Sequence, residues 1–225
     1  LSPSRTFDLV ESVWDLRYLA RTPMDMQGVA SRDTGISADG PLTASGSFAY
    51  RAMIGAGTNF GNESGDGKKY MLAVSWHPAP NLVFDFYVDD ERLPGKADRS
   101  TLQAFAGYNS DALRWGLLYS HQDRQQDAPL ELVSAFLVRP VAPRLALIGR
   151  VDRIIEPSPR GDNIDYIPFD PDAPAPKRLA PAEYRVSETF RITPNLLWTT
   201  YDRPDSGSRP DDDLHLRLTF FLDFE

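Results

Sequence analysis

The sequence predicts an all-β protein, an antiparallel up-and-down β-barrel of about eleven strands with a short helix near its N-terminus. Three observations predict this fold. Apolar and polar residues alternate through most of the chain after residue 45, and alternation with a period of two places one set on each face of a strand. The connections between the alternating segments are in turn short and long. No apolar run approaches the roughly 18 residues that a membrane-spanning helix needs.

The alternation is strongest in the last segment, where Leu216, Leu218 and Phe220 occupy every second position. A shift of one residue would exchange the two faces of such a strand, so the pattern indicates one apolar and one polar face. The regular segments are residues 47–54, 69–76, 82–89, 101–108, 112–121, 145–152, 190–199 and 214–224. Less regular segments at residues 36–40, 131–139 and 180–186 bring the count to about eleven.

The N-terminal residues follow a different period. Leu9, Val13 and Leu16 recur at helical spacing, with charged residues between them, so residues 6–20 are predicted to form a short amphipathic helix. Two placements stay open: the helix packs on the barrel or covers one mouth, or it folds into the lumen and narrows it. We therefore divide the chain into a loop segment with this helix, residues 1–33, and the β-barrel strands, residues 34–225.

Composition excludes several classes of function. The 225 residues include 24 Lys and Arg against 32 Asp and Glu, a formal net charge of −8, whereas a nucleic-acid partner needs a basic surface. Absence of cysteine excludes a disulfide scaffold, thiol catalysis and cysteine-ligated zinc. The three histidines, His77, His121 and His215, have no partner at i, i+4. We therefore expect no metal ion and no other cofactor.

The lengths of the connections favour a transmembrane barrel. The long connections, at residues 55–68, 91–100, 122–129, 155–179 and 202–213, alternate with short turns, so an up-and-down meander brings all of them to one end. Outer-membrane barrels show this asymmetry, and soluble β-sandwiches have no reason to sort their loops by length. The lumen of about eleven strands is also too wide to be filled by these apolar side chains. We therefore predict that the apolar face contacts a lipid bilayer and that the polar face lines a water-filled lumen.

The polar faces carry charges of both signs, with a slight excess of cations. A charged, wet wall orders permeating solutes and sets mild ion selectivity, so we expect a weak preference for anions. The predicted lumen-lining residues are Arg51, Lys69, Asp85, Asp89, Arg114, Glu131, Arg144, Arg150, Asp152, Arg191 and Arg217. The residues predicted to face lipid most clearly are Phe84, Phe86, Leu216, Leu218 and Phe220.

Two stretches resemble known porins. HLRLTFFLDFE, residues 215–225, resembles the C-terminal strand of outer-membrane porins, although one Glu follows the expected terminal Phe. Residues 31–78 contain SRDTGISADGPL and SGSFAYRAMIGAGTNFGNESGDGKKYMLAVSWHP, and they are similar to bacterial porins of the phosphate-selective type, which pair an R-D-x-G strand with an S-F-x-Y strand. The family's ladder of phosphate-binding arginines and lysines is not matched position by position, so the resemblance does not extend to phosphate selectivity.

The resemblance implies a channel without enzymatic activity in the outer membrane of a Gram-negative-type bacterium. Such a channel passes small hydrophilic solutes or anions by diffusion, forms a homotrimer, and is inserted by the barrel-insertion machinery through its C-terminal strand. Two alternatives stay open. The barrel is a structural sleeve or a binding partner for another protein, or it is an outer-membrane hydrolase, which requires Ser or Asp beside a His on the outer rim.

The strand count carries one more expectation. Bacterial single-chain barrels have an even number of strands, and the alternating loops make the first predicted strand descend from the long-loop side. We therefore expect that N-terminal strands are missing and that the full barrel has about 16 strands.

Overall fold

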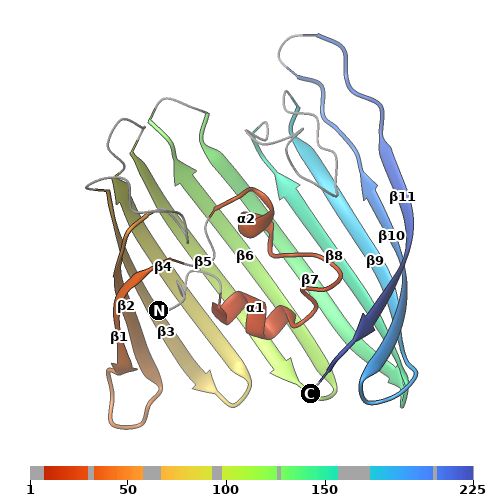
Figure 1. The fold of residues 1–225 in the computed structure, drawn as a ribbon, viewed down its shortest axis with the longest axis horizontal. Coiled ribbons are helices and arrows are strands. Elements are labelled where there is room, and N and C mark those ends of the chain that lie inside the picture. The colour runs from red at the N-terminus through yellow and green to blue at the C-terminus, as the bar shows by residue number, and fades with distance from the viewer. Residues whose placement is uncertain are drawn as a thin grey trace.

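The computed structural model describes residues 8–29, 33–57, 67–92, 98–125, 128–156, 173–204 and 207–224. These residues form two short helices and one 11-stranded antiparallel sheet whose spatial order follows the sequence from β1 to β11 (Figure 1). The predicted all-β, up-and-down architecture is therefore confirmed, and all three of the less regular segments are strands.

Most strands are long enough to cross a bilayer, since a membrane strand needs about 9–11 residues. Nine of them, β3 to β11, have 10–13 residues. The strands are β1 (Gly35–Pro41), β2 (Phe48–Gly55), β3 (Lys68–Ala79), β4 (Leu82–Arg92), β5 (Arg99–Ser110), β6 (Leu113–Asp123), β7 (Leu130–Ala142), β8 (Leu145–Ile154), β9 (Ala175–Arg185), β10 (Phe190–Thr199) and β11 (Asp213–Leu222).

The strand ends that short turns join and the strand ends that long connections join lie on opposite edges of the sheet (Figure 1). The register is continuous along the pairs except for two irregularities, at Trp76/Ala79 and Pro140/Ala142, both beside short turns. Among the described residues no pairing joins β1 to β11, so both strands are open edges of the sheet. Neither described helix has the length and hydrophobicity that a membrane crossing requires.

The N-terminal segment contains α1 (Asp8–Trp14) and α2 (Pro23–Met26). The helix predicted over residues 6–20 thus exists but ends earlier, and residues 6 and 7 lie outside the described part of the chain. Helix α1 ends at Trp14 because the next residue, Asp15, has a φ of 51°. This value lies in the left-handed region, through which an α-helix cannot continue. The apolar spacing continued to Leu16 and Leu19 because both are buried in the same cluster as α1.

The two faces of the sheet differ sharply. On one face, called the outer face, apolar side chains stay exposed, including Phe84, Phe86, Leu216, Leu218 and Phe220. The opposite, inner face carries the N-terminal segment, with α1 over β5 and β6 (Figure 1). The main cluster of buried apolar residues lies between this segment and the sheet, and it includes Val13, Trp14, Phe105, Leu118 and Phe136.

Candidate functional site

The inner face is the candidate functional site because it gathers the charged side chains of most strands. In β3 and β4 the inward positions include Lys69, Ser75, Asp85 and Asp89, all of which are buried. The apolar side chains that alternate with them point outward, because successive side chains of a strand lie on opposite faces. Alternation therefore gathers the charged and polar side chains of these strands on the inner face of the sheet.

Over β2–β4 the inward charges form close ion pairs. Arg51 Nη2 lies 2.8 Å from Asp85 Oδ1, and Lys69 Nζ lies 2.9 Å from Asp89 Oδ2. The hydroxyl of Tyr87 also donates a hydrogen bond of 2.7 Å to Asp89. The side chains of Lys69 and Asp89 are only 2% and 0% exposed. A buried ion pair is tolerated when further hydrogen bonds satisfy it, as Tyr87 does here.

Under the N-terminal segment a second group of charges is buried. Arg150 Nε and Lys177 Nζ lie 2.8 Å and 3.0 Å from the two carboxylate oxygens of Asp152. Arg150 also donates a hydrogen bond of 2.7 Å to the carbonyl oxygen of Arg21, and its guanidinium lies 5.0 Å from the centre of the Trp14 ring. These cations therefore attach the N-terminal segment to the wall.

A row of three arginines crosses β8–β10 at the short-turn end of the inner face. Arg185 lies directly opposite Arg191 in the register, and its backbone N–H donates a hydrogen bond of 2.8 Å to the carbonyl oxygen of Arg144. The three side chains line a pocket of about 450 Å³, together with Arg114 and Glu183. Asp15 and Asp111 also line the pocket, so its four arginines meet three carboxylates and leave an excess of one positive charge.

Tyr18 connects the N-terminal segment to this pocket. Its hydroxyl donates a hydrogen bond to Glu183, which lies 3.6 Å from Arg191. Its ring stacks on that of Phe221, with 4.5 Å between ring centres. Burial, and then the hydrogen bond to Glu183, raise the pKa of the Tyr18 phenol to about 12. Tyr18 therefore stays neutral over the physiological range.

Charge is unevenly distributed around the inner face of the described strands. The inward positions of β1–β4 hold two cations and four carboxylates, a balance of −2, and those of β8–β11 hold five cations and three carboxylates, a balance of +2. The first group is Arg51, Lys69, Asp39, Asp85, Asp89 and Glu91. The second is Arg150, Lys177, Arg185, Arg191, Arg217, Asp152, Glu183 and Asp213.

Most residues predicted to line the lumen lie on this face. The inward ones are Arg51, Lys69, Asp85, Asp89, Arg114, Arg150, Asp152, Arg191 and Arg217. Arg144 precedes β8 in a turn and lines the arginine pocket. These residues lie in two different environments. Arg150 and Asp152 are covered by the N-terminal segment, whereas Arg144 and Arg191 line an open pocket.

The placement predicted for Glu131 is wrong. Glu131 pairs with His121 in the register and accepts a hydrogen bond of 2.9 Å from the hydroxyl of Tyr119, and both of these residues lie on the outer face. The inward positions of β7 hold Leu132, Phe136 and other buried residues. Because the inner face of β7 packs against the N-terminal segment, both of its faces are apolar, and the alternation in the sequence does not identify the inner one.

Three inward cations of the described strands were missed, namely Arg99, Lys177 and Arg185. Arg99 falls in the connection predicted over residues 91–100, whereas β5 starts at this residue. Lys177 was assigned to a long connection because β9 was expected to start at residue 180, whereas it starts at Ala175. Lys177, Leu179 and Glu183 occupy inward positions that alternate with outward ones. Pro176 and Pro181, which are uncommon in strands, make this alternation hard to recognise in the sequence. Arg185 was included in the predicted strand, but its position opposite Arg191 follows only from the register.

No group of three or more His, Asp or Glu residues in the described part of the chain could hold a metal ion. Two of the histidines lie on opposite faces of the sheet: His121 on the outer face in β6, and His215 on the inner face in β11.

No known protein family matches the sequence, and no curated protein is significantly similar to it. Solved structures do resemble it. A porin refined at 1.8 Å resolution matches 86% of this chain and 63% of its own length with a TM-score of 0.55 and 14% identity. An anion-selective porin from Comamonas acidovorans matches 84% of this chain and 55% of its own, with a TM-score of 0.49 and 13% identity. The first likeness shows that the chain has a porin fold, and the chain spans less than two thirds of the length of either porin.

Proposed function

We propose that this chain forms the wall of a water-filled outer-membrane channel of a Gram-negative-type bacterium, through which small hydrophilic solutes pass by diffusion with a weak preference for anions. The observation that carries the proposal is the opposite chemistry of the two faces: large apolar side chains are exposed on the outer face while charged ones point inward. A soluble barrel has the reverse arrangement. The chain is assigned no chemical step and no cofactor.

Aromatic side chains at two levels of the outer face support a membrane location. At the short-turn end, Phe48, Trp76 and Phe84 stack in a row with ring centres 5.7 Å and 5.4 Å apart. Towards the long-loop end lie Tyr70 and Trp198, both exposed. Tyr70 and Trp76 are six positions apart in β3, or about 20 Å at 3.3 Å per residue. Two aromatic girdles around an apolar band are typical of membrane barrels.

The unequal charge around the inner face supports selective diffusion. A balance of −2 on β1–β4 faces one of +2 on β8–β11, and opposed charges produce a field across the lumen that orients solutes. The N-terminal segment lies on the inner face, so in this proposal it narrows the lumen. Of the two placements left open by the sequence, this one is adopted.

The proposal includes closure of the sheet. An unpaired strand edge is not tolerated in lipid, and β1 and β11 are both unpaired on one side among the described residues. We propose that further strands close a barrel of about 16, the size that leaves an aqueous channel. The barrel assembles as a homotrimer, and the barrel-insertion machinery recognises β11. The resemblance to porins of the phosphate-selective type supports anions as the solutes, and we do not propose phosphate selectivity.

Conductance across a planar bilayer under a salt gradient tests the function. The full-length protein is expected to give stepwise openings and a reversal potential of weak anion preference. In the double variant Arg185→Gln, Arg191→Gln the reversal potential moves towards cation preference, because two inward cations are lost. Arg139→Gln is the matched control, since Arg139 is exposed on the outer face at the same end, and it is expected to leave the potential unchanged. A wild-type protein that forms no openings, or one that strongly prefers cations, contradicts the proposal.

A further inference from the structure

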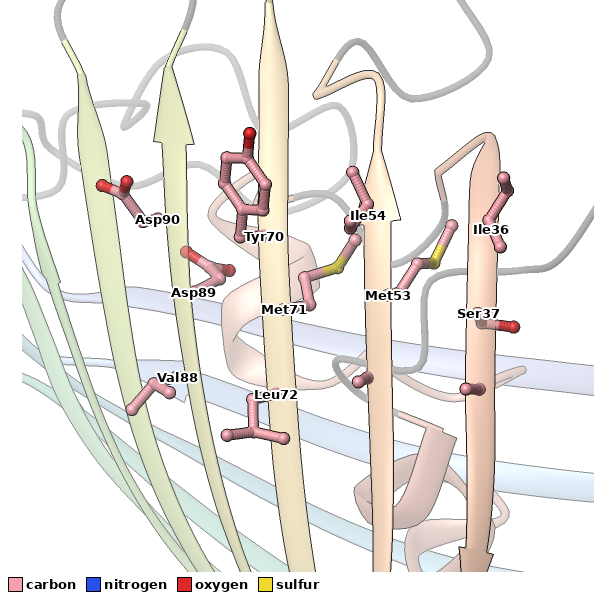
Figure 2. A pocket seen from close by; sticks show the side chains of 12 residues that line it. Ile36, Ser37, Met53, Ile54, Tyr70, Met71, Leu72, Val88, Asp89 and Asp90 are labelled. Carbon is pink, nitrogen blue, oxygen red and sulfur yellow. The ribbon is translucent and has the colours of Figure 1, made fainter.

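An apolar groove of about 600 Å³ lies on the outer face over β1–β4 (Figure 2). Eight of its lining residues are outward by register, and four inward ones alternate with them. Two alanines, Ala38 and Ala52, lie opposite each other in one cross-strand row, between larger side chains such as Ile54 and Leu72. The missing side-chain volume in that row leaves the depression.

The groove ends in a pair of cations on the long-loop side. Lys68 lies directly opposite Arg92 in the β3–β4 register, and both side chains are exposed on the outer face. Between them and the alanine row lie Tyr70 and Asp90. Asp90 accepts a hydrogen bond of 2.9 Å from Nε of Arg92, whose side chain stays 70% exposed.

This arrangement fits a ligand with an anionic head and an apolar tail. Opposed like charges destabilise each other, and an anion between Lys68 and Arg92 removes that repulsion. Arginine offers a fork of N–H donors that suits a phosphate group. The cation row lies one outward position beyond Tyr70, or about 7 Å along the strand, which is where lipid phosphates lie beyond an aromatic girdle.

A second groove on the same face serves as an internal comparison. It has a volume of about 530 Å³ and lies over β4–β8, with Ala104, Ala106 and Ala135 among its lining residues. The charges at its long-loop end are balanced by neighbours: Arg153 pairs with Asp202, and Glu131 accepts the hydrogen bond of Tyr119. The two grooves share size and apolar character. Arg92 is paired with Asp90 much as Arg153 is with Asp202, so they differ in Lys68, which adds one cation at the end of the first groove.

We propose that the groove over β1–β4 binds an anionic lipid of the leaflet on the long-loop side, with a phosphate of its headgroup between Lys68 and Arg92 and an acyl chain over Ala52. The inference rests on the proposed function in one respect, the contact of the outer face with a bilayer. The second groove accepts acyl chains without selecting the headgroup.

Lipid retention by the full-length protein tests the site. The protein is purified from micelles that contain equal amounts of phosphatidylglycerol and phosphatidylcholine, and retained lipid is identified by native mass spectrometry. We expect a preference of about tenfold for phosphatidylglycerol, since two cations act on one headgroup. Lys68→Gln combined with Arg92→Gln should abolish this preference, and Lys68→Arg should preserve it. Equal retention of both lipids by the wild type overturns the inference.

The role of the groove is tested separately from that of the cations. Ala52→Phe fills the alanine row and should reduce retention of phosphatidylglycerol at least about fivefold, by the loss of acyl-chain contact. Ala106→Phe makes the same change in the second groove and should leave the preference intact. An excess of inorganic phosphate should not displace the lipid. If it does, or if Ala52→Phe has no effect, the site binds a free anion and the lipid assignment is wrong.

The inference and the proposed function fail independently. A protein that conducts but retains both lipids equally contradicts the lipid site alone. A protein that prefers phosphatidylglycerol, loses the preference in the double variant and forms no openings supports the lipid site and contradicts the channel.

Discussion

Two regions of the inner face, over β2–β4 and under the N-terminal segment, have the same place in the alternation but different chemistry. Over β2–β4 the charged inward side chains are paired across strands, as in Arg51–Asp85 and Lys69–Asp89, beside a small buried cluster of Met53, Met71, Ala73 and Tyr87. Under the N-terminal segment, Phe105, Leu118 and Phe136 point inward and pack against Trp14.

The difference shows that the residues of a wall depend on what covers it. The charges over β2–β4 are buried and therefore need partners of opposite sign, whereas the positions under the folded-back segment gain free energy from burying apolar surface. The charges under the segment, such as Arg150, contact the segment itself.

The largest effect is expected when the segment loses its main contact. Trp14 is 1% exposed, packs edge-on against Phe136 at 5.0 Å, and donates a hydrogen bond of 2.7 Å to the carbonyl oxygen of Ala20. Trp14→Ala should destabilise the docked segment by about 3–5 kcal/mol. Limited proteolysis at the exposed Arg17 should then become much faster. Ser12→Ala, at an exposed site on the same helix, is the control, and equal cleavage rates for the two variants would contradict the docking.

The second prediction concerns the buried ion pair over β3 and β4. Lys69→Met leaves the carboxylate of Asp89 buried without its cation, which should lower the free energy of unfolding by about 3 kcal/mol. Urea denaturation in micelles measures the loss. The double variant Lys69→Met, Asp89→Leu removes both charges and should recover most of the stability. If it is no more stable than the single variant, the ion pair is not the origin of the effect.

The third prediction tests how tightly the covered region is packed. A Cβ added at Gly116 would lie 2.4 Å from Cε1 of Phe136 and 2.8 Å from Cε2 of Phe105. Gly116→Val should therefore cost about 1–3 kcal/mol by overpacking, and the same denaturation experiment detects it. Gly149 is the matched control, because a Cβ there meets nothing within 4 Å. A cost for Gly149→Val as large as that for Gly116→Val would show that the loss does not come from contacts with Phe105 and Phe136.

The smallest effect is a pH dependence of docking. The pKa of Tyr18 is raised in the folded protein, from 10 to about 12, so the neutral phenol is favoured when the segment is docked. This contribution is fully present below pH 10 and is lost as the pH rises from 10 to about 12. Proteolysis of the segment should accelerate over that interval. Tyr18→Phe keeps the ring that stacks on Phe221 and should remove the pH dependence; an unchanged profile would assign it to another group.

The sequence by itself determined the strands, their order and, for most of them, the outward face. In β11 the alternation of Leu216, Leu218 and Phe220 with polar residues leaves one arrangement only, because a shift of one residue exchanges the faces. The alternation of short and long connections likewise follows from local sequence. The period of two within the strands placed Arg51, Lys69 and most other candidate residues on one face.

Only the tertiary structure decided which part of the wall is covered and which charges meet. Glu131 lies outside because β7 packs against a segment more than a hundred positions away in the chain. Arg185 opposes Arg191 because of the β9–β10 register, and the helix stops at Asp15 where the chain turns across the sheet. The physical reason is the same in each case: a period of two gives a strand two faces, but neighbours that are distant in sequence determine the environment of each face.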